Sequence, residues 1–424
     1  MSLQRSNHSP FFRLTIIVPL SLLSLSPCHP VTGSADPPVT FQVQTAAGGA
    51  ASGPLLELGA AWRVRLGGPQ PRRTEADDLL ELRQVGRPLP RMPEGEQLVF
   101  VNGDRLPGAV VKLVGERLHF RPRLATKAPD ERELTPPLSA LALIWLADLD
   151  TAPHADRLRR ELLAGKRTRD VVHLRNGDVV EGILTGLDDK SVQVEVERKP
   201  LDIKRERIAV IALNTELAVP LRPKGAYGRA VLAGGARLAL ATAACADGKT
   251  LTGTTFFQAP VRVPLEEVVA LYVHQGKAVY LSDVKPKQYQ YTPFLPGKLN
   301  RPYVADGGAD GRDLRLADST FDKGLGMPGG SRITFDLAGG YRRFEALVGL
   351  AADPDGPGGS VRLRVLVDDK LHDLTPDRDL TARDGPLPVR IDVTGAKALT
   401  LAVDFGRGGP VQDRVNWADA RLIR

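Results

Sequence analysis

Short runs of alternating apolar and polar residues, separated by turn residues, make up most of the chain after residue 40. An apolar residue at every second position is typical of half-buried β-strands. Glycine and proline are frequent, with 42 and 34 copies, which favours short strands and many turns over long helices. A chain of 424 residues exceeds one ordinary hydrophobic core. The pattern therefore predicts a mostly β protein with several domains.

The middle of the chain repeats one β unit. Its two clearest copies contain an apolar strand that runs into Asn102-Gly103-Asp104 or Asn176-Gly177-Asp178. Because Asn-Gly accepts positive φ angles, each predicts a β-hairpin whose second strand reaches another glycine five residues after the first. Weaker copies open near Phe41 and Arg229. Units of this size resemble small SH3-like or Sm-like β-barrels.

Residues 150–168 interrupt these repeats and predict a helix. Leu158, Leu162 and Leu163 share one face, and Pro153 stands where a first-turn proline is tolerated. The arginines of this segment suit contact with an acidic polymer, but a solvated linker helix is the favoured interpretation.

The last third of the chain shows the clearest alternation. Apolar residues recur at every second position around Ile333, Val361, Val389 and Leu399, with turns rich in Gly, Asp and Pro between them. Antiparallel strands at this spacing predict two packed sheets. Three aromatic residues fall on the apolar positions and are assigned to the core: Phe335, Phe344 and Phe405.

Four separated motifs in this last third carry a family resemblance: Tyr280-Leu281-Ser282-Asp283, Lys323-Gly324-Leu325-Gly326, Tyr341-Arg342-Arg343-Phe344 and Asn416-Trp417-Ala418-Asp419. In order and spacing, residues 279–424 resemble the NPCBM/NEW2 family of carbohydrate-binding modules. The resemblance implies a galactose-binding-like jelly roll that binds a glycan. The family commonly carries a valine-histidine-like pair after Lys-Gly-x-Gly, where this chain has Met327-Pro328.

Sugar binding needs aromatic faces that stack on the pyranose, and carboxylates, amides or arginines that hydrogen-bond its hydroxyls. Such groups gather on the loop 302–313 and on the segment 412–419. The predicted carbohydrate-binding residues are therefore Tyr303, Asp306, Asp310, Arg312, Asp413 and Trp417. Alternatives remain for both surfaces. The Asp and Gly residues of the loop also suit simple turns, and Trp417 suits a core anchor at the start of the last strand.

Metal binding is a further alternative for the same loop. Asp306, Asp310 and Asp313 offer the carboxylate oxygens that Ca²⁺ prefers, although their spacing is not that of an EF-hand loop. No other cofactor is expected.

The N-terminal 35 residues have the pattern of a secretory signal. Arg5 and Arg13 precede an apolar stretch at 14–25, and Gly33-Ser34-Ala35 offers small residues for cleavage. The apolar stretch is too short to cross a bilayer, and no later segment predicts a transmembrane anchor. We expect a secreted, periplasmic or cell-envelope protein. Its mature chain keeps one cysteine, Cys245, whose alanine neighbours indicate a small buried hydrophobe.

The expected architecture is several small SH3-like or Sm-like β-barrel units followed by an antiparallel jelly-roll β-sandwich. The boundaries of this organisation are a signal at 1–35, β units at 36–96, 97–149, 169–216 and 217–278, the helical linker at 150–168, and the sandwich at 279–424.

No reaction chemistry is recognisable in the sequence. The histidines are scattered without metal-ligand spacing, and there is no nucleophile elbow or phosphate-cradling loop. The formal net charge of +7 suits acidic envelope polymers. Nucleic acid is set aside, because a basic platform with stacking aromatics is missing.

The main hypothesis is a secreted, non-catalytic protein that binds a glycan or polysaccharide through loops of the C-terminal sandwich. The alternative is an envelope scaffold that binds proteins and no sugar. A glycoside hydrolase, or an accessory subunit of one, is the third hypothesis, because two carboxylates brought together by the fold are enough for that chemistry.

Overall fold

The computed structural model describes residues 39–69, 71–75, 77–125, 133–149, 155–221, 223–352 and 358–424. The predicted signal at 1–35 lies outside these residues. Strands account for most of the described chain, in agreement with the predicted fold class. No helix among the described residues is long and apolar enough to cross a membrane.

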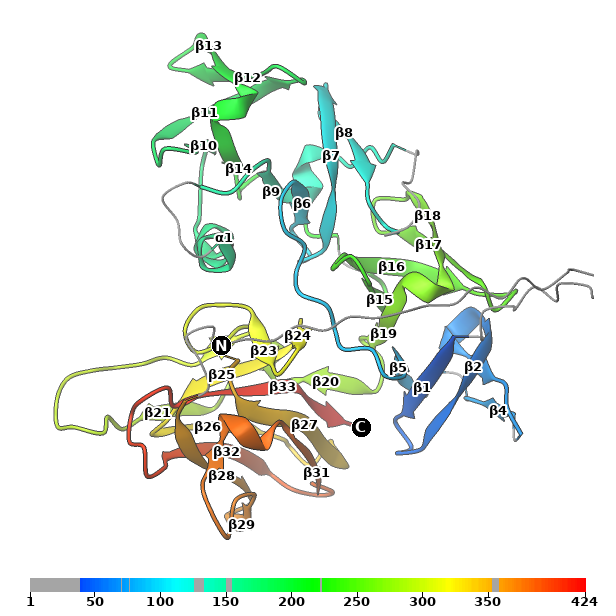
Figure 1. Ribbon diagram of the computed structural model, residues 1–424, viewed down its shortest axis with the longest axis vertical. Coiled ribbons are helices and arrows are strands. Elements are labelled where there is room, and N and C mark those ends of the chain that lie inside the picture. The colour runs from blue at the N-terminus through cyan, green and yellow to red at the C-terminus, as the bar shows by residue number, and fades with distance from the viewer. Residues whose placement is uncertain are drawn as a thin grey trace, which may run out of the picture. The chain divides into compact units, whose positions relative to one another are not determined.

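Residues 40–274 form four successive β units, which we call units A to D (Figure 1). Unit A contains β1 (Thr40–Thr45), β2 (Ala50–Leu58), β3 (Val64–Leu66), β4 (Arg72–Arg73) and β5 (Leu79–Gln84). Unit B contains β6 (Gln97–Phe100), β7 (Arg105–Val114), β8 (Arg117–Pro122) and β9 (Leu141–Trp145). Unit C contains β10 (Asp170–Leu174), β11 (Val179–Leu187), β12 (Ser191–Val196), β13 (Lys199–Lys204) and β14 (Ile208–Ala212). Unit D contains β15 (Tyr227–Leu232), β16 (Arg237–Ala244), β17 (Thr250–Thr255), β18 (Pro260–Pro264) and β19 (Val268–His274).

The turn between the first two strands is the same in all four units. Gly48, Gly103, Gly177 and Gly235 have φ angles of 84° to 94°. Each donates its N–H to the carbonyl three residues earlier, at 2.9 to 3.0 Å. Both predicted Asn-Gly hairpins are therefore confirmed, and the two outer units use the same turn with different residues.

The second glycine of the predicted pattern has a packing role. A Cβ atom on Gly108 would lie 2.2 Å from the carbonyl oxygen of Arg121, and one on Gly182 would lie 2.4 Å from Val194. Gly53 holds the same place in unit A, 2.2 Å from the Gly67 carbonyl oxygen. The missing side chain lets the second strand approach its neighbour closely where it bends. Unit D has Leu240 at this place, which explains its weaker sequence pattern.

In every unit the first strand pairs with the last as well as with the second. A short 3-10 turn precedes the last strand in units B, C and D: η2 (Leu138–Ala140), η3 (Arg205–Arg207) and η4 (Leu265–Glu267). First-to-last pairing is what a small closed barrel requires. The assignment of these units to the SH3-like or Sm-like class, and their exact boundaries, remain predictions.

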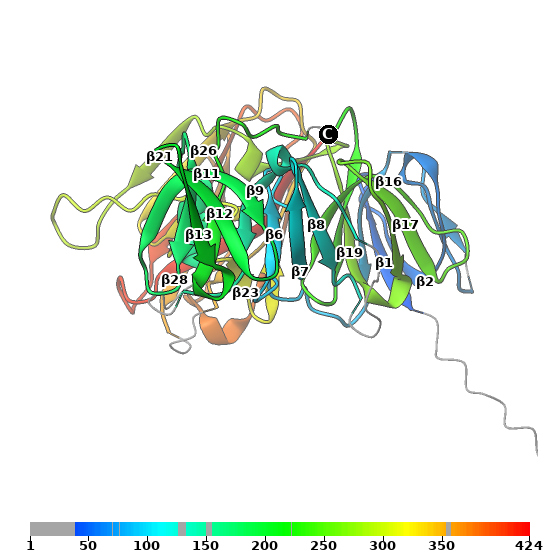
Figure 2. The ribbon, with the colours of Figure 1, turned by 90° about the horizontal axis from the view of Figure 1, so that it is seen from above.

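The last strands also join the units in pairs. β5 of unit A pairs with β19 of unit D, and β9 of unit B pairs with β14 of unit C. A further pairing, of β7 in unit B with β16 in unit D, connects the two pairs, so that the strands of all four units form one network (Figure 2). As a result, β14 and β19 are buried along their whole length. One face of each strand lines the core of its own unit, and the other face needs a separate cover.

The helix α1 (Ala155–Ala164) covers the paired last strands of units B and C. Leu158 and Leu162 pack against Trp145 of β9 and Val210 of β14, while Leu163 is exposed. The prediction of a helix is confirmed. The expectation of a solvated linker is wrong, because the strand pairing creates an apolar surface that the helix buries.

The C-terminal sandwich covers the corresponding surface of units A and D. Its hairpin of β23 (Leu314–Leu316) and β24 (Ser319–Phe321) packs on Val269 and Tyr272 of β19. Phe321 is fully buried there, and the guanidinium of Arg83 lies 5.9 Å from its ring centre.

Two antiparallel sheets build the sandwich, as predicted. The first contains β22 (Val304–Ala305), β25 (Gly324–Pro328), β33 (Arg414–Ile423), β27 (Arg343–Leu350) and β31 (Leu387–Asp392), with β20 (Ala278–Tyr280) beside β33. The second contains β21 (Gln288–Tyr291), β26 (Ser331–Asp336), β32 (Ala398–Phe405), β28 (Ser360–Val367) and β29 (Lys370–Asp373), with β30 (Leu380–Thr381) beside β28. Phe335 and Phe344 are buried between the sheets, in agreement with their predicted core role.

Replacing Phe321 with Ala is expected to destabilise the chain by about 3–5 kcal/mol, because a fully buried ring leaves a cavity at the junction. Urea unfolding of the full chain measures this change. Leu371→Ala, at an exposed position of β29, is the control and should cost less than about 0.5 kcal/mol. Equal losses in both variants would contradict the packing described above.

Candidate functional site

The predicted loop at 302–313 begins with the short strand β22, which pairs with Leu325 and Gly326 of β25. Asp306 follows in a left-handed conformation with φ 53°. Its carboxylate accepts hydrogen bonds from Lys323 Nζ at 2.7 Å and from the Gly324 N–H at 3.2 Å. Asp306 therefore helps to hold the loop on the sheet and has little free hydrogen-bonding capacity.

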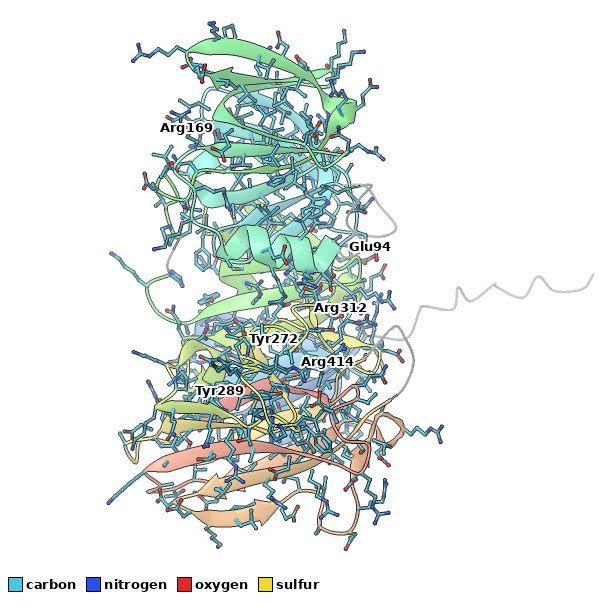
Figure 3. The ribbon with its side chains drawn as sticks, turned by 90° about the vertical axis from the view of Figure 1, so that its left-hand side faces the viewer. Glu94, Arg169, Tyr272, Tyr289, Arg312 and Arg414 are labelled. Carbon is cyan, nitrogen blue, oxygen red and sulfur yellow. The ribbon has the colours of Figure 1, made fainter. Side chains whose placement is uncertain are left out.

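Two predicted residues further along this loop, Asp310 and Arg312, form a charged group with Arg414. Asp310 lies 3.5 Å from Arg312 Nε and 3.4 Å from Arg414 Nη1, which comes from the start of β33. Figure 3 labels both arginines on the same part of the sandwich. All three side chains are partly exposed. This Asp–Arg group presents both charge signs to hydrogen-bonding ligands.

The predicted Tyr303 packs against a second tyrosine. Its ring centre is 5.2 Å from that of Tyr289, which is partly exposed and whose hydroxyl donates to the Arg301 carbonyl at 2.5 Å. The Arg301 side chain in turn lies 3.0 Å from Asp413 Oδ1. Burial raises the pKa of Asp413 and Arg301 opposes this rise, while Asp413 Oδ2 has no hydrogen-bond partner among the described residues.

Trp417 does not fit its predicted role as a sugar platform. Its side chain is 0% exposed and belongs to the core between the two sheets. β33 places Trp417 opposite Leu325 and Val348 in the middle of the first sheet. The alternative interpretation as a core anchor is the one that its burial supports.

The carboxylates proposed as Ca²⁺ ligands are each engaged by cations of the chain. Asp306 pairs with Lys323, Asp310 with Arg312 and Arg414, and Asp313 with three arginines from outside the sandwich. Within the described ranges, no group of three acidic, histidine or cysteine side chains is arranged to hold a metal ion. The calcium alternative is therefore not supported.

One side of the predicted loop is built into the junction with the repeats. Arg160 of α1 donates to the Asp306 carbonyl at 2.5 Å, and the Asp313 N–H donates to Asp156 at 3.2 Å. This part of the loop is therefore not open to a ligand. The Asp310, Arg312 and Tyr303 side chains keep partial exposure.

A pocket of about 310 Å³ was missed by sequence reasoning. It is lined by Gln290, Thr292, Gly330, Arg332, Asp404 and Phe405. Phe405 is partly exposed, so its assignment to the core was wrong: it is the last residue of β32, where the alternation runs out of the sheet. The exposed ring of Phe294 meets it edge-on at 5.2 Å.

The pocket and the predicted segment at 412–419 adjoin at Gly329. A Cβ atom there would lie 2.6 Å from Asp413 Oδ2 and 3.0 Å from the Phe405 ring. Asp404 lies 2.5 Å from Arg364 and 3.9 Å from Arg332. The Phe405 ring, the Arg332 guanidinium and the Asp404 carboxylate thus line one opening. The run Gln-Tyr-Gln-Tyr-Thr-Pro-Phe at 288–294 was the available sequence signal.

Comparison with known proteins confirms the resemblance. Residues 277–423 match the model of the NPCBM/NEW2 domain, so this segment is similar to the domains of that family. Among solved structures, CBM51 of GH95 from Clostridium perfringens, in complex with methyl-galactose, is 25% identical and covers 34% of this chain and 99% of that one, with a TM-score of 0.30.

Two other similar structures contain more than one module. One contains the CBM51-2 module, in complex with GlcNAc, and the INT domains of ZmpB from Clostridium perfringens. It is 22% identical, and the match covers 44% of this chain and 40% of that one, with a TM-score of 0.31. The tandem CBM51 modules of the family 98 glycoside hydrolase from Streptococcus pneumoniae are 13% identical, cover 66% of this chain and 99% of that one, and give 0.30. No curated protein matches the chain.

Buried ion pairs fix the sandwich to unit D. Asp322 follows β24 and accepts from Arg229 Nε at 2.6 Å and from Arg237 Nε at 2.9 Å. Burial alone would raise the pKa of Asp322, but the two guanidinium groups outweigh it and hold the pKa well below its usual range. A carboxylate whose pKa is depressed on folding stabilises the fold at neutral pH, and that contribution is lost as pH falls below about 4.

Asp322→Asn is therefore expected to cost about 3–5 kcal/mol at pH 7, since buried Arg237 loses its carboxylate partner and buried Arg229 keeps only Asp104. The difference from the parent chain should shrink at pH 3, because Asp322 is then largely protonated in the unfolded parent chain while it stays ionised in the folded one. Urea unfolding at both pH values measures this. Asp369→Asn, in the exposed turn after β28, should change neither value; a pH-independent loss in Asp322→Asn would refute the electrostatic explanation.

Proposed function

We propose that this chain is a secreted, non-catalytic protein that binds a glycan through its C-terminal sandwich. The observation that carries this proposal is the NPCBM/NEW2 match over residues 277–423, supported by an open pocket on the same domain. Relatives in complex with methyl-galactose and with GlcNAc suggest a neutral saccharide as the first ligand class to test.

The proposed binding surface extends from the Phe405 pocket to the Asp–Arg group at Asp310. The Phe405 ring offers an apolar face for a pyranose, and Gln290, Arg332 and Asp404 offer donors and acceptors for its hydroxyls. Tyr303 and Arg312 lie along the remainder of the surface, beyond the Arg301–Asp413 pair. Asp306 and Trp417 are left out of the site, because one is tied to Lys323 and the other is buried.

A scaffold role is the second candidate, and one observation favours it. Arg421 lies 3.3 Å from Glu81 of β5, and Arg229 and Arg237 engage Asp322, so one side of the sandwich is committed to the repeats. The four β units then serve as a rigid support that presents the sandwich. An envelope scaffold without sugar binding would show a blank glycan array and a co-purifying protein.

Phe405→Ala is expected to weaken saccharide binding about tenfold or more, since stacking on an aromatic face supplies over 1 kcal/mol. Calorimetric titration of the full chain with a galactose- or GlcNAc-containing saccharide that is positive on an array measures the effect. Leu371→Ala, an exposed apolar residue on β29, is the matched control and should bind as the parent does. Unchanged affinity in Phe405→Ala would place the site elsewhere.

Arg312→Ala and Tyr303→Ala test the loop separately. Each is expected to weaken binding three- to tenfold without unfolding, because both side chains are partly exposed and one hydrogen bond or contact is lost. Arg378→Ala, an exposed arginine of the same sandwich, is the control. If both loop variants bind normally while Phe405→Ala does not, the saccharide is confined to the pocket.

A further inference from the structure

The loop at 292–303, which connects β21 to β22, projects beyond the strands of the sandwich in Figure 1 and again in Figure 2. Its Phe294, Leu295 and Leu299 side chains, which we call the apolar tip, are 52%, 71% and 62% exposed. Single exposed apolar residues are normal on a protein surface, but three of them on one projecting loop indicate a binding partner.

A neighbouring loop lies against this apolar tip. Residues 406–413 connect β32 to β33, and a Cβ atom on Gly409 would lie 3.4 Å from the Phe294 ring. Val411, two residues further along, is 63% exposed. The exposed apolar surface is therefore shared by two loops that meet at Phe294.

Both ends of the projecting loop are fixed to the sandwich. The Thr292 N–H donates to the Gly330 carbonyl at 2.8 Å, and Arg301 pairs with the buried carboxylate of Asp413 at 3.0 Å. Pro296 restricts the backbone within the apolar tip. Because the loop is held in shape at both ends, docking it on a partner costs little ordering entropy.

The exposed charge of the two loops is positive. Residues 292–303 and 406–412 contain no acidic residue and three basic ones, Lys298, Arg301 and Arg407. Lys298 and Arg407 are exposed. The two carboxylates at the base of the loops are engaged, Asp413 by Arg301 and Asp404 by Arg364. The apolar tip is thus flanked by cationic side chains without exposed acids in the same loops.

We propose that these loops dock the protein on an anionic lipid surface, with the apolar tip in the outer acyl region and Lys298 and Arg407 among the headgroups. Apolar and aromatic side chains beside Lys and Arg are typical of segments that lie in a membrane interface. Tyr291 and Tyr303, partly exposed at the base, suit the headgroup level.

The shape of the loop favours lipid over a protein partner. A projecting tip is buried on all sides only by a medium that surrounds it, as a lipid layer does, whereas a flat protein surface covers one side. Phe294 also contacts Phe405, so docking brings the Phe405 pocket to the membrane surface. The inference does not rest on glycan binding.

The test is sedimentation of the full chain with vesicles of phosphatidylcholine alone and of phosphatidylcholine mixed with phosphatidylglycerol. We expect saturable binding to the mixed vesicles, weaker binding to phosphatidylcholine, and a partial loss of binding in high sodium chloride because salt screens the cationic residues. The vesicles carry no saccharide, so a failure here leaves the glycan proposal untouched.

Leu295→Gln should weaken vesicle binding about tenfold or more, since an apolar side chain no longer enters the lipid. Leu371→Gln is the matched control: Leu371 is 53% exposed on β29, at the opposite edge of the second sheet from β21, and should bind as the parent does. Both positions are exposed, so both variants should keep the unfolding temperature of the parent.

Leu295→Trp reports insertion directly. The native Trp62, Trp145 and Trp417 are buried, so a new indole at the exposed tip supplies the vesicle-dependent signal. We expect its emission to move to shorter wavelength when mixed vesicles are added. Normal vesicle binding by Leu295→Gln, or an unshifted emission of Leu295→Trp, overturns the proposal. So does a dimer that ignores vesicles and that Leu295→Gln dissociates, because the tip then contacts a second copy.

Discussion

The architecture depends on how the last strand of each β unit is buried, because these strands pair with another strand along both edges. β14 and β19 are each hydrogen-bonded to a strand of their own unit and to the last strand of another unit. Their backbone groups are satisfied by this pairing, but one apolar face of each pair is left outside the cores of the units. Helix α1 buries the first face and the β23–β24 hairpin buries the second. The apolar surface thereby connects the repeats to the sandwich.

This constraint decides which part of the sandwich is open to a ligand. The side with Phe321, Asp322 and Arg421 is committed to apolar contact and buried ion pairs with units A and D. Asp313 and the backbone of Asp306 are committed to α1 and unit B. The Phe405 pocket and the Asp310 group keep exposed side chains. The position of the open surface on the sandwich is thus a consequence of this packing arrangement.

Much of the candidate site could be predicted from the sequence by residue type, but its geometry could not. Asp310 and Arg312 lie close together on one loop, whereas Tyr303 packs against Tyr289, and the role of all three in binding stays a prediction. Asp306 is tied up by Lys323, which lies just before β25 and 17 positions further along the chain. The assignment of Phe405 was wrong in the opposite sense, because alternation places this residue in the core. Its strand ends there, and Gly329 and Gly330 have no side chains to cover one side of the ring.

The sequence by itself determined the local structure. Glycines at positive φ set the hairpins, glycines without a Cβ allowed close strands, and alternation selected the buried faces, because each depends only on a residue and its near neighbours in the chain. The tertiary structure alone decided which last strands pair, what covers them and which charges meet. Those choices depend on residues such as Arg229 and Asp322, which lie 93 positions apart and whose interaction no local pattern encodes.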